Sequence, residues 1–79
     1  MEKLFTLELD QNDETIELHL NKVGAEFLRN VLSKLIDNNQ ECDHHFMTPD
    51  WGGKELSSDQ QNLSPEIKLL HQLKIVYWR

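Results

Sequence analysis

The sequence predicts a single α+β domain, in which a four-stranded, mostly antiparallel sheet carries one main helix packed on one face. Residues 4–10 and 15–20 alternate between apolar and polar side chains, the period of a half-buried strand. Residues 22–37 instead place apolar side chains at helical spacing. The alternation returns at residues 42–48 and 71–78, so the expected element order is β-β-α-β-β.

The first two strands are expected to form a hairpin, because only the polar residues 11–14 separate them. A register that sets Leu9 opposite Ile16 brings the two apolar faces together. The same register places Glu8 directly opposite Glu17 on the other face, where two like charges repel. Either the register is shifted by two residues, or the acidic outer face has a role.

The helix at 22–37 has a suitable N-cap in Asn21, and Gly24 in its first turn is expected to permit a close approach to the sheet. The helix is expected to lie on the apolar face of the hairpin. A right-handed crossing then sets the third strand beside the first, which gives the strand order 2-1-3-4. The second face of this sheet is left open to solvent, and the hairpin residues on it are Thr6, Glu8, Glu17 and His19.

A loop is expected at 49–64, because Pro49 cannot donate to a strand ladder and a glycine pair follows it. Leu56 is expected to anchor this loop in the core. Trp51 lies at the apex of the loop, and we interpret it as a core lid in preference to an interface anchor, although Trp suits both places.

Residues 58–64 are polar and without periodicity, and we expect them to be the most mobile part of the chain. The Ser-Pro pair that follows is typical of a helix start, so one helical turn is predicted over residues 65–70.

Composition excludes several classes of function. The 79 residues include 14 acidic and 8 basic side chains, for a net charge of −6. This balance argues against binding to nucleic acid or to an anionic membrane, and favours a protein partner with a basic surface. Cys42 is the single cysteine, the start does not resemble a signal peptide, and no stretch is apolar enough to span a bilayer. A cytoplasmic protein is expected.

The residues that could carry chemistry gather around Cys42, followed by Asp43, His44 and His45. Their spacing is not that of a zinc site, and as neighbours on a strand they point to alternate faces. Nothing in the sequence indicates an oxyanion hole for a cysteine nucleophile, and the glycine pair lacks the spacing of a phosphate loop. No catalytic residue, metal ligand or cofactor is therefore expected, and the protein is not expected to be an enzyme.

Residues 45–57 and 73–78 together resemble the immunity protein 32 family of bacterial polymorphic toxin systems. These are small α+β proteins with a Trp and a Gly-Gly-x-x-Leu motif. The matching residues here, which we expect to have a structural role, are Trp51, Gly52, Gly53 and Leu56. The resemblance implies a protein that neutralises its cognate toxin by direct binding and without catalysis.

An acidic surface would suit a toxin with a basic active cleft, such as a nuclease. The residues expected to face the toxin are Asp10, Asp13, Glu14, Asp50, Trp51 and Glu55. One alternative is a structural or housekeeping module that forms a homodimer through its open sheet face. A metal-dependent enzyme is the third possibility.

Overall fold

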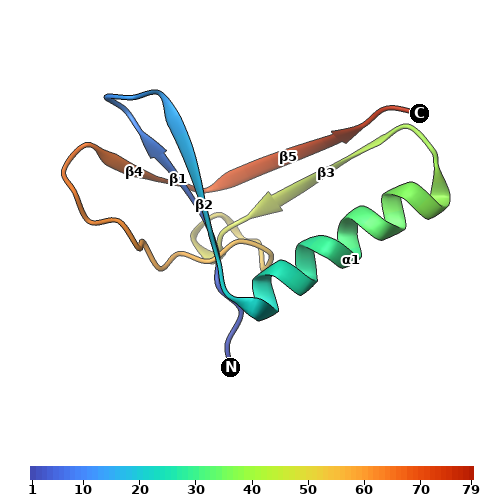
Figure 1. Cartoon of the computed structure of the whole chain (residues 1–79), viewed down its shortest axis with the longest axis horizontal. Helices are drawn as coiled ribbons and strands as arrows, with labels where there is room; N and C mark the ends of the chain where they lie inside the picture. Colours follow the sequence, from blue (N-terminus) through green and yellow to red (C-terminus); the bar gives the residue numbers. More distant parts are fainter.

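The computed structural model describes all 79 residues and contains one α-helix and five strands in two antiparallel sheets (Figure 1). One sheet has the order β2-β1-β4, and the other pairs β3 with β5. The α+β class is confirmed, but the single four-stranded sheet is wrong. The elements are β1 (Phe5–Asp10), β2 (Thr15–Leu20), α1 (Lys22–Asn38), β3 (Cys42–Met47), a short 3-10 helix η1 (Pro49–Trp51), β4 (Ile67–Leu70) and β5 (Gln72–Tyr77).

The β1–β2 hairpin has the register that the sequence predicts. Leu9 lies opposite Ile16, and Glu8 lies opposite Glu17, so the two carboxylates do share one face. The turn is held by the side chain of Asp10, whose Oδ1 accepts hydrogen bonds from the backbone amides of Asn12 at 3.0 Å and Asp13 at 3.2 Å. Of the two registers that the sequence left open, the structure therefore has the one without the shift.

The predicted helical turn at 65–70 is wrong. Residues Ile67–Leu70 instead form β4, which pairs antiparallel with β1, and Ile67 is buried. Because β4 occupies the edge of β1 away from β2, the third strand cannot pair there, and the predicted order 2-1-3-4 is also wrong. β3 pairs with β5, and His71 alone separates β4 from β5.

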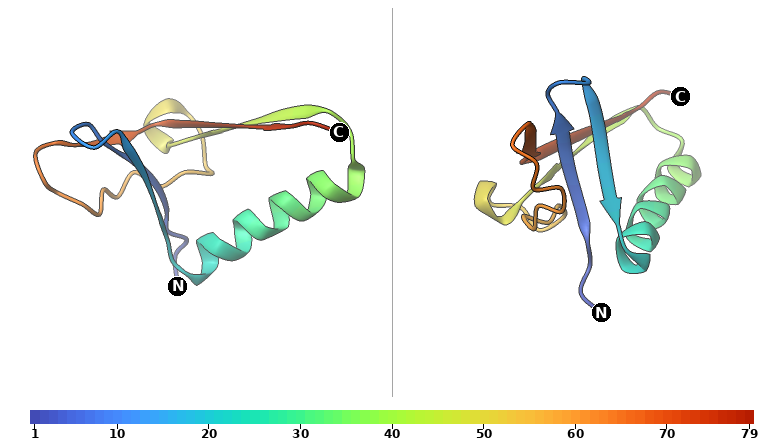
Figure 2. Two further views of the ribbon diagram at one scale, coloured as in Figure 1. Left: turned by 45° about the horizontal axis from the view of Figure 1, so that its top comes forward. Right: turned by 60° about the vertical axis from the view of Figure 1, so that its left-hand side comes forward.

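The core lies where α1 covers the β3–β5 pair and the base of the hairpin. Figure 1 and the left view of Figure 2 show α1 leaving the end of β2 and running along β3 and β5. Three phenylalanine rings meet there: Phe5 lies 5.6 Å from Phe27 and 6.1 Å from Phe46, measured between centroids. Leu56 is buried beside Phe5 and Phe46 in the same cluster. A single aromatic cluster therefore joins both sheets to the helix.

The start of α1 fits tightly against the chain before β1. The Oδ1 of Asn21 accepts hydrogen bonds from the backbone amides of Gly24 at 2.9 Å and Leu4 at 3.0 Å. A Cβ at Gly24 would lie 1.9 Å from the Leu4 carbonyl oxygen. Both expectations for this junction, an Asn cap and a glycine that permits close approach, are confirmed.

The open second face predicted for the sheet is wrong at β1. Thr6 and Glu8 are both fully buried, because residues 57–62 run over them. The Thr6 hydroxyl donates to the Asp59 carbonyl at 3.2 Å, and the backbone amide of Ser57 donates to the Phe5 carbonyl at 2.8 Å. The polar side chains of β1 thus bind the segment that we expected to be the most mobile part of the chain.

The molecule is more open than its length requires. Its radius of gyration is 13.4 Å, against about 11.6 Å for a compact domain of this length. Only ten of the 79 residues are buried, and six of these form the apolar core. The single helix falls short of the length and apolar character that a membrane crossing requires. A large part of the apolar surface is therefore left without a covering layer.

Candidate functional site

The turn after β3 is organised around Thr48, which is fully buried. Its carbonyl oxygen accepts hydrogen bonds from the amides of Trp51 and Gly53, each at 2.9 Å. Its hydroxyl lies 2.8 Å from Nδ1 of His71, and its amide donates to the His71 carbonyl at 3.0 Å. These bonds connect the turn to the junction between β4 and β5.

The glycine pair allows this turn to close. Gly52 has a φ of +84°, a left-handed conformation that L side chains adopt at a cost. A Cβ at Gly53 would lie 2.3 Å from the Met47 carbonyl oxygen, so no side chain fits there without moving the backbone. Leu56 follows and is 2% exposed. Within the Gly-Gly-x-x-Leu stretch, the glycines shape the turn and the leucine fills the core.

Trp51 is not a core lid, as it is 55% exposed. Its indole lies almost parallel to the ring of His71, with centroids 5.3 Å apart and 10° between the planes. The stack fixes the orientation of the indole while leaving more than half of the residue accessible. Aromatic side chains held in this way suit an interface, because little conformational entropy is lost on binding.

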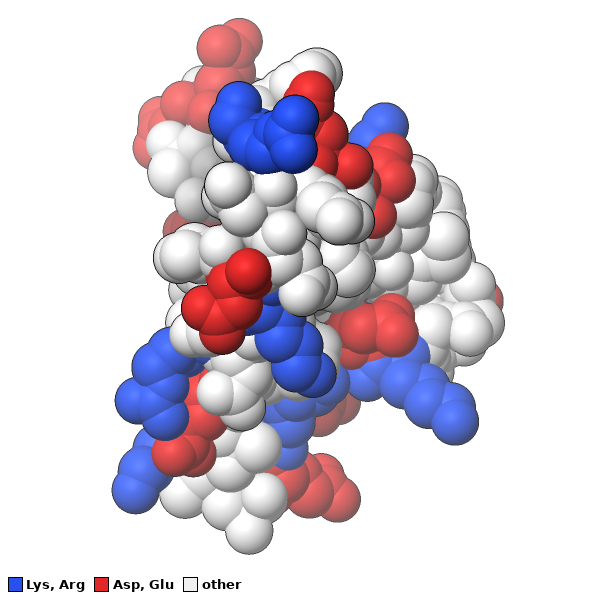
Figure 3. All heavy atoms as spheres, turned by 90° about the vertical axis from the view of Figure 1, so that its right-hand side faces the viewer, with Lys and Arg blue, Asp and Glu red and all other residues white.

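The acidic residues expected at the interface lie in separate places. Asp13 and Glu14 are exposed in the hairpin turn, whereas Asp50 is exposed in η1 beside Trp51. Figure 1 and the right view of Figure 2 show the hairpin turn apart from η1. The face drawn in Figure 3 carries basic and acidic side chains interspersed, without a broad acidic field. Asp10 is half-buried and caps the hairpin turn.

Glu55 is engaged within the turn itself. Its Oε1 accepts hydrogen bonds from the amides of Met47 at 3.2 Å and Lys54 at 3.4 Å. The Met47 hydrogen bond is the largest influence that holds the pKa of Glu55 below 4.5, and the nearby Lys3 ammonium adds to the effect. Desolvation lowers the pKa of Lys3, whose Nζ lies 4.1 Å from the centroid of the Phe27 ring.

An apolar strip on the hairpin is exposed, although the sequence predicts that the helix lies on this face. It consists of Leu9, Ile16 and Leu18, and we call it the hairpin strip. Ile16 is 60% exposed and Leu18 is 39% exposed, because α1 covers only the base of the hairpin face. Periodicity identified this face as apolar but not how far the helix extends over it. Exposed apolar residues elsewhere are Leu32, Ile36, Leu63, Val76 and Trp78.

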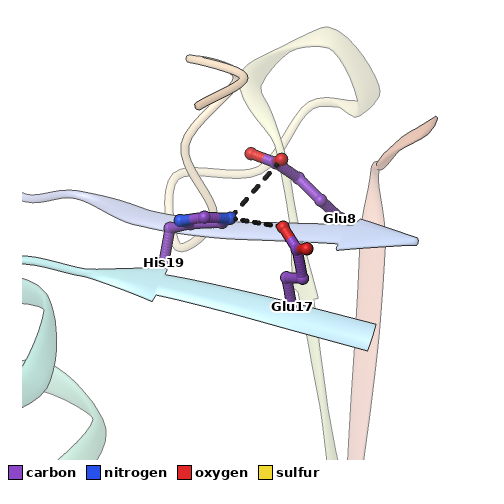
Figure 4. Close-up of side chains that lie close together, drawn as sticks. All are labelled: Glu8, Glu17 and His19. Atoms are coloured by element: carbon purple, nitrogen blue, oxygen red, sulfur yellow. Dashed lines mark hydrogen bonds and ion pairs between the residues drawn. The ribbon is translucent and has the colours of Figure 1, made fainter. Parts of the chain in front are cut away.

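A second unexpected feature is a cluster of Glu8, Glu17 and His19 on the opposite face of the hairpin (Figure 4). It is the only group of three or more potential metal-ligating side chains whose ligand atoms converge. The candidates on β3 do not converge. Cys42 and His44 are exposed, and His45 hydrogen-bonds to Gln72. In the sequence, the only sign of the cluster of Glu8, Glu17 and His19 was the expected pairing of Glu8 opposite Glu17. The burial of Glu8 could not be predicted.

The structure has no pocket of a size that would enclose a small molecule. The accessible features are the hairpin strip, the stacked Trp51 and the exposed carboxylates. No protein family, curated protein or solved structure matches this chain. The likeness of residues 45–57 and 73–78 to the immunity proteins therefore stays a prediction that rests on those residues alone.

Proposed function

We propose that this chain acts by binding another protein, and that the partner is a toxin that it neutralises without catalysis. The observation that carries the proposal is the hairpin strip, where Ile16 and Leu18 remain exposed on β2. A contiguous apolar surface of this kind on a small domain typically marks a protein interaction site.

The strip is preorganised for binding. Leu9 lies on β1, which has hydrogen-bonded strands on both sides, and on β2 Ile16 lies directly opposite Leu9 while Leu18 is opposite Leu7. The base of the hairpin is fixed by the packing of Phe5 against Phe27. A partner that covers the strip has little ordering entropy to overcome, so the apolar area it buries contributes more fully to affinity.

Charge favours a basic partner. The turn that joins Leu9 to Ile16 contains Asp13 and Glu14, both exposed, so acidic groups border one end of the strip. An apolar centre with a charged rim is the usual anatomy of an interface, and rim charges accelerate encounter with an oppositely charged partner. The net charge of −6 also favours a basic partner.

The experiment is co-expression of this chain with each toxin-like domain found among its neighbouring genes, together with binding kinetics on the purified pair. Ile16→Lys should raise the Kd by about tenfold or more, since it places a charge in the apolar centre. Val76→Lys is the matched control, because Val76 is an exposed apolar strand residue outside the strip. The Val76→Lys variant should bind the toxin with the same affinity as the wild type.

Charge reversal tests the rim separately. The double substitution Asp13→Lys, Glu14→Lys should slow association by about tenfold at low salt, with a smaller effect at high salt. Protection of cells from the toxin should weaken in the same order as affinity. The proposal fails if the wild-type chain neither binds the toxin nor protects, or if Val76→Lys is more harmful than Ile16→Lys.

Self-association is the second candidate function, and the β3–β5 pair favours it. This sheet has only two strands, so each strand has an unpaired outer edge, and isolated two-stranded sheets are marginally stable. A second copy could extend the sheet. Light-scattering mass measured across a wide range of concentration distinguishes the two candidates: a constant monomer mass excludes self-association, and a concentration-dependent dimer supports it.

A further inference from the structure

We propose that Glu8, Glu17 and His19 bind a divalent transition metal ion, with zinc the best match to their ligand types. The donor atoms, one from each side chain, all lie within 4.8 Å of one another (Figure 4). His19 Nε2 is 2.9 Å from Glu17 Oε1 and 3.5 Å from Glu8 Oε1. Tetrahedral zinc holds such ligands at about 2.0–2.2 Å, which sets them about 3.3 Å apart. Binding therefore requires only small movements.

The surroundings of Glu8 are compatible with a cation. Its carboxylate is fully buried, and no Lys or Arg pairs with it. The second carboxylate, Glu17, is its direct cross-strand neighbour. The Nε2 atom of His19 can carry only one proton, which the carboxylates of Glu8 and Glu17 must share. Backbone amides and His19 already partner Glu8, and a divalent ion would in addition neutralise the charge of both glutamates.

Neighbouring groups hold the carboxylates in place. The amides of Gln61 and Asn62 donate to Glu8 Oε2 at 2.7 Å and to Glu8 Oε1 at 3.1 Å. The side-chain amide of Asn62 lies 3.4 Å from both oxygens of Glu17. Such outer hydrogen bonds orient metal ligands, and Glu8 Oε1 keeps a second lone pair for the ion.

One side of the cluster is open to solvent. The side chains of His19 and Glu17 are 31% and 29% exposed, which leaves a path for the ion and room for water as a fourth ligand. On binding, His19 Nε2 must be unprotonated, so the ring proton lies on Nδ1 and the hydrogen bond to Glu17 is replaced by metal–ligand bonds. No electron transfer takes place.

The test is titration of the chelator-treated full chain with Zn²⁺ by calorimetry, and with Co²⁺ by visible absorption. We expect a single ion per chain. His19→Gln and Glu17→Gln should each weaken binding by at least about tenfold. The control removes the β3 ligands with Cys42→Ser, His44→Gln and His45→Gln, and it should bind zinc as the wild type does. Glu8→Gln is less informative, because it can disrupt the bonds to Gln61 and Asn62.

A second readout is the imidazole nitrogen resonances, measured by NMR with and without Zn²⁺. The resonance of His19 Nε2 should shift on metal addition, in the wild type and in the β3 control alike. The proposal is overturned if no stoichiometric uptake occurs, if His19→Gln binds zinc as tightly as the wild type, or if the β3 control loses the site. An unchanged His19 Nε2 resonance in zinc-loaded protein also overturns it.

Discussion

Trp51 and His71 stack with their ring planes 10° apart, and this contact joins the turn after β3 to the single residue between β4 and β5. Thr48 reinforces the connection through its hydroxyl, which lies 2.8 Å from His71 Nδ1. Trp51 is 55% exposed and His71 is half-buried, whereas Thr48 is fully buried. The two contacts should therefore contribute different amounts to the free energy of unfolding.

We expect Thr48→Val to lower the free energy of unfolding by about 1–3 kcal/mol, because it leaves His71 Nδ1 without its buried partner. Trp51→Ala should cost less, about 0.5–1.5 kcal/mol for the lost aromatic contact. Urea unfolding of both variants measures the difference. A larger loss for Trp51→Ala would mean that the stack, and not the hydroxyl, holds the turn.

The two adjacent glycines should respond differently to alanine. Gly53→Ala places a Cβ against the Met47 backbone, 2.3 Å from its carbonyl oxygen. The backbone must shift, so we expect a loss of more than about 2 kcal/mol. Gly52→Ala meets no atom and costs only the left-handed conformation, about 1–2 kcal/mol. Gly52→Asn is the control and should be milder still, as Asn tolerates this conformation. Equal losses at both positions would contradict this assignment, and thermal unfolding provides the comparison.

Asn21 should be sensitive because its Oδ1 serves two backbone amides, those of Gly24 and Leu4. Asn21→Ala is expected to cost about 1–2 kcal/mol, at the upper end for an N-cap, since it leaves both donors without that acceptor. Asn21→Asp keeps the acceptor and should lose less. Circular dichroism during urea unfolding measures both variants, and equal losses would argue against the capping role.

Stability should fall in acid in part through Glu55. Its folded-state pKa lies below 4.5, mainly because the charged carboxylate accepts the Met47 amide. A depressed pKa means that the ionised form favours the fold. This contribution is complete above about pH 4.5 and is lost as the pH falls through the folded-state value. Glu55→Gln should therefore show a smaller loss of stability between pH 6 and pH 3, about the range over which carboxyl groups titrate. An identical acid profile for variant and wild type would exclude this role.

Truncation of apolar side chains should separate the core from the open surface. Leu56→Ala is expected to cost about 2–5 kcal/mol, because Leu56 is 2% exposed within the cluster of Phe5 and Phe46. Ile36→Ala should change stability by less than about 1 kcal/mol, since Ile36 is 65% exposed. If Ile36→Ala were as damaging as Leu56→Ala, the end of α1 would be covered in solution, which would support self-association.

Local elements followed from the sequence because their signals are local. The alternation of Leu9 and Ile16 with their polar neighbours defined both strands and brought their apolar faces together, and the unshifted register is the one observed. Asn21 and Gly24 marked the start of the helix. Each of these features depends on residues within a few positions of one another, where side-chain period and capping chemistry act directly.

Long-range pairing did not follow from the sequence. Residues 67–70 form an apolar run with one lysine and no alternation, and Pro65 before them suggested a helix. Their strand form comes from the free edge of β1, which no periodicity encodes. Burial of Glu8 depends in the same way on the amides of Gln61 and Asn62, more than fifty residues away in the chain. The cluster at Glu8 was therefore visible as a charge conflict but not as a site.

Both sheets take their last strand from residues 67–77, on the two sides of His71. During synthesis on the ribosome, the β1–β2 hairpin and α1 can form early. The pairing of β1 with β4 and of β3 with β5 must wait until this stretch emerges. In the interval the nascent chain exposes the unpaired edges of β1 and β3.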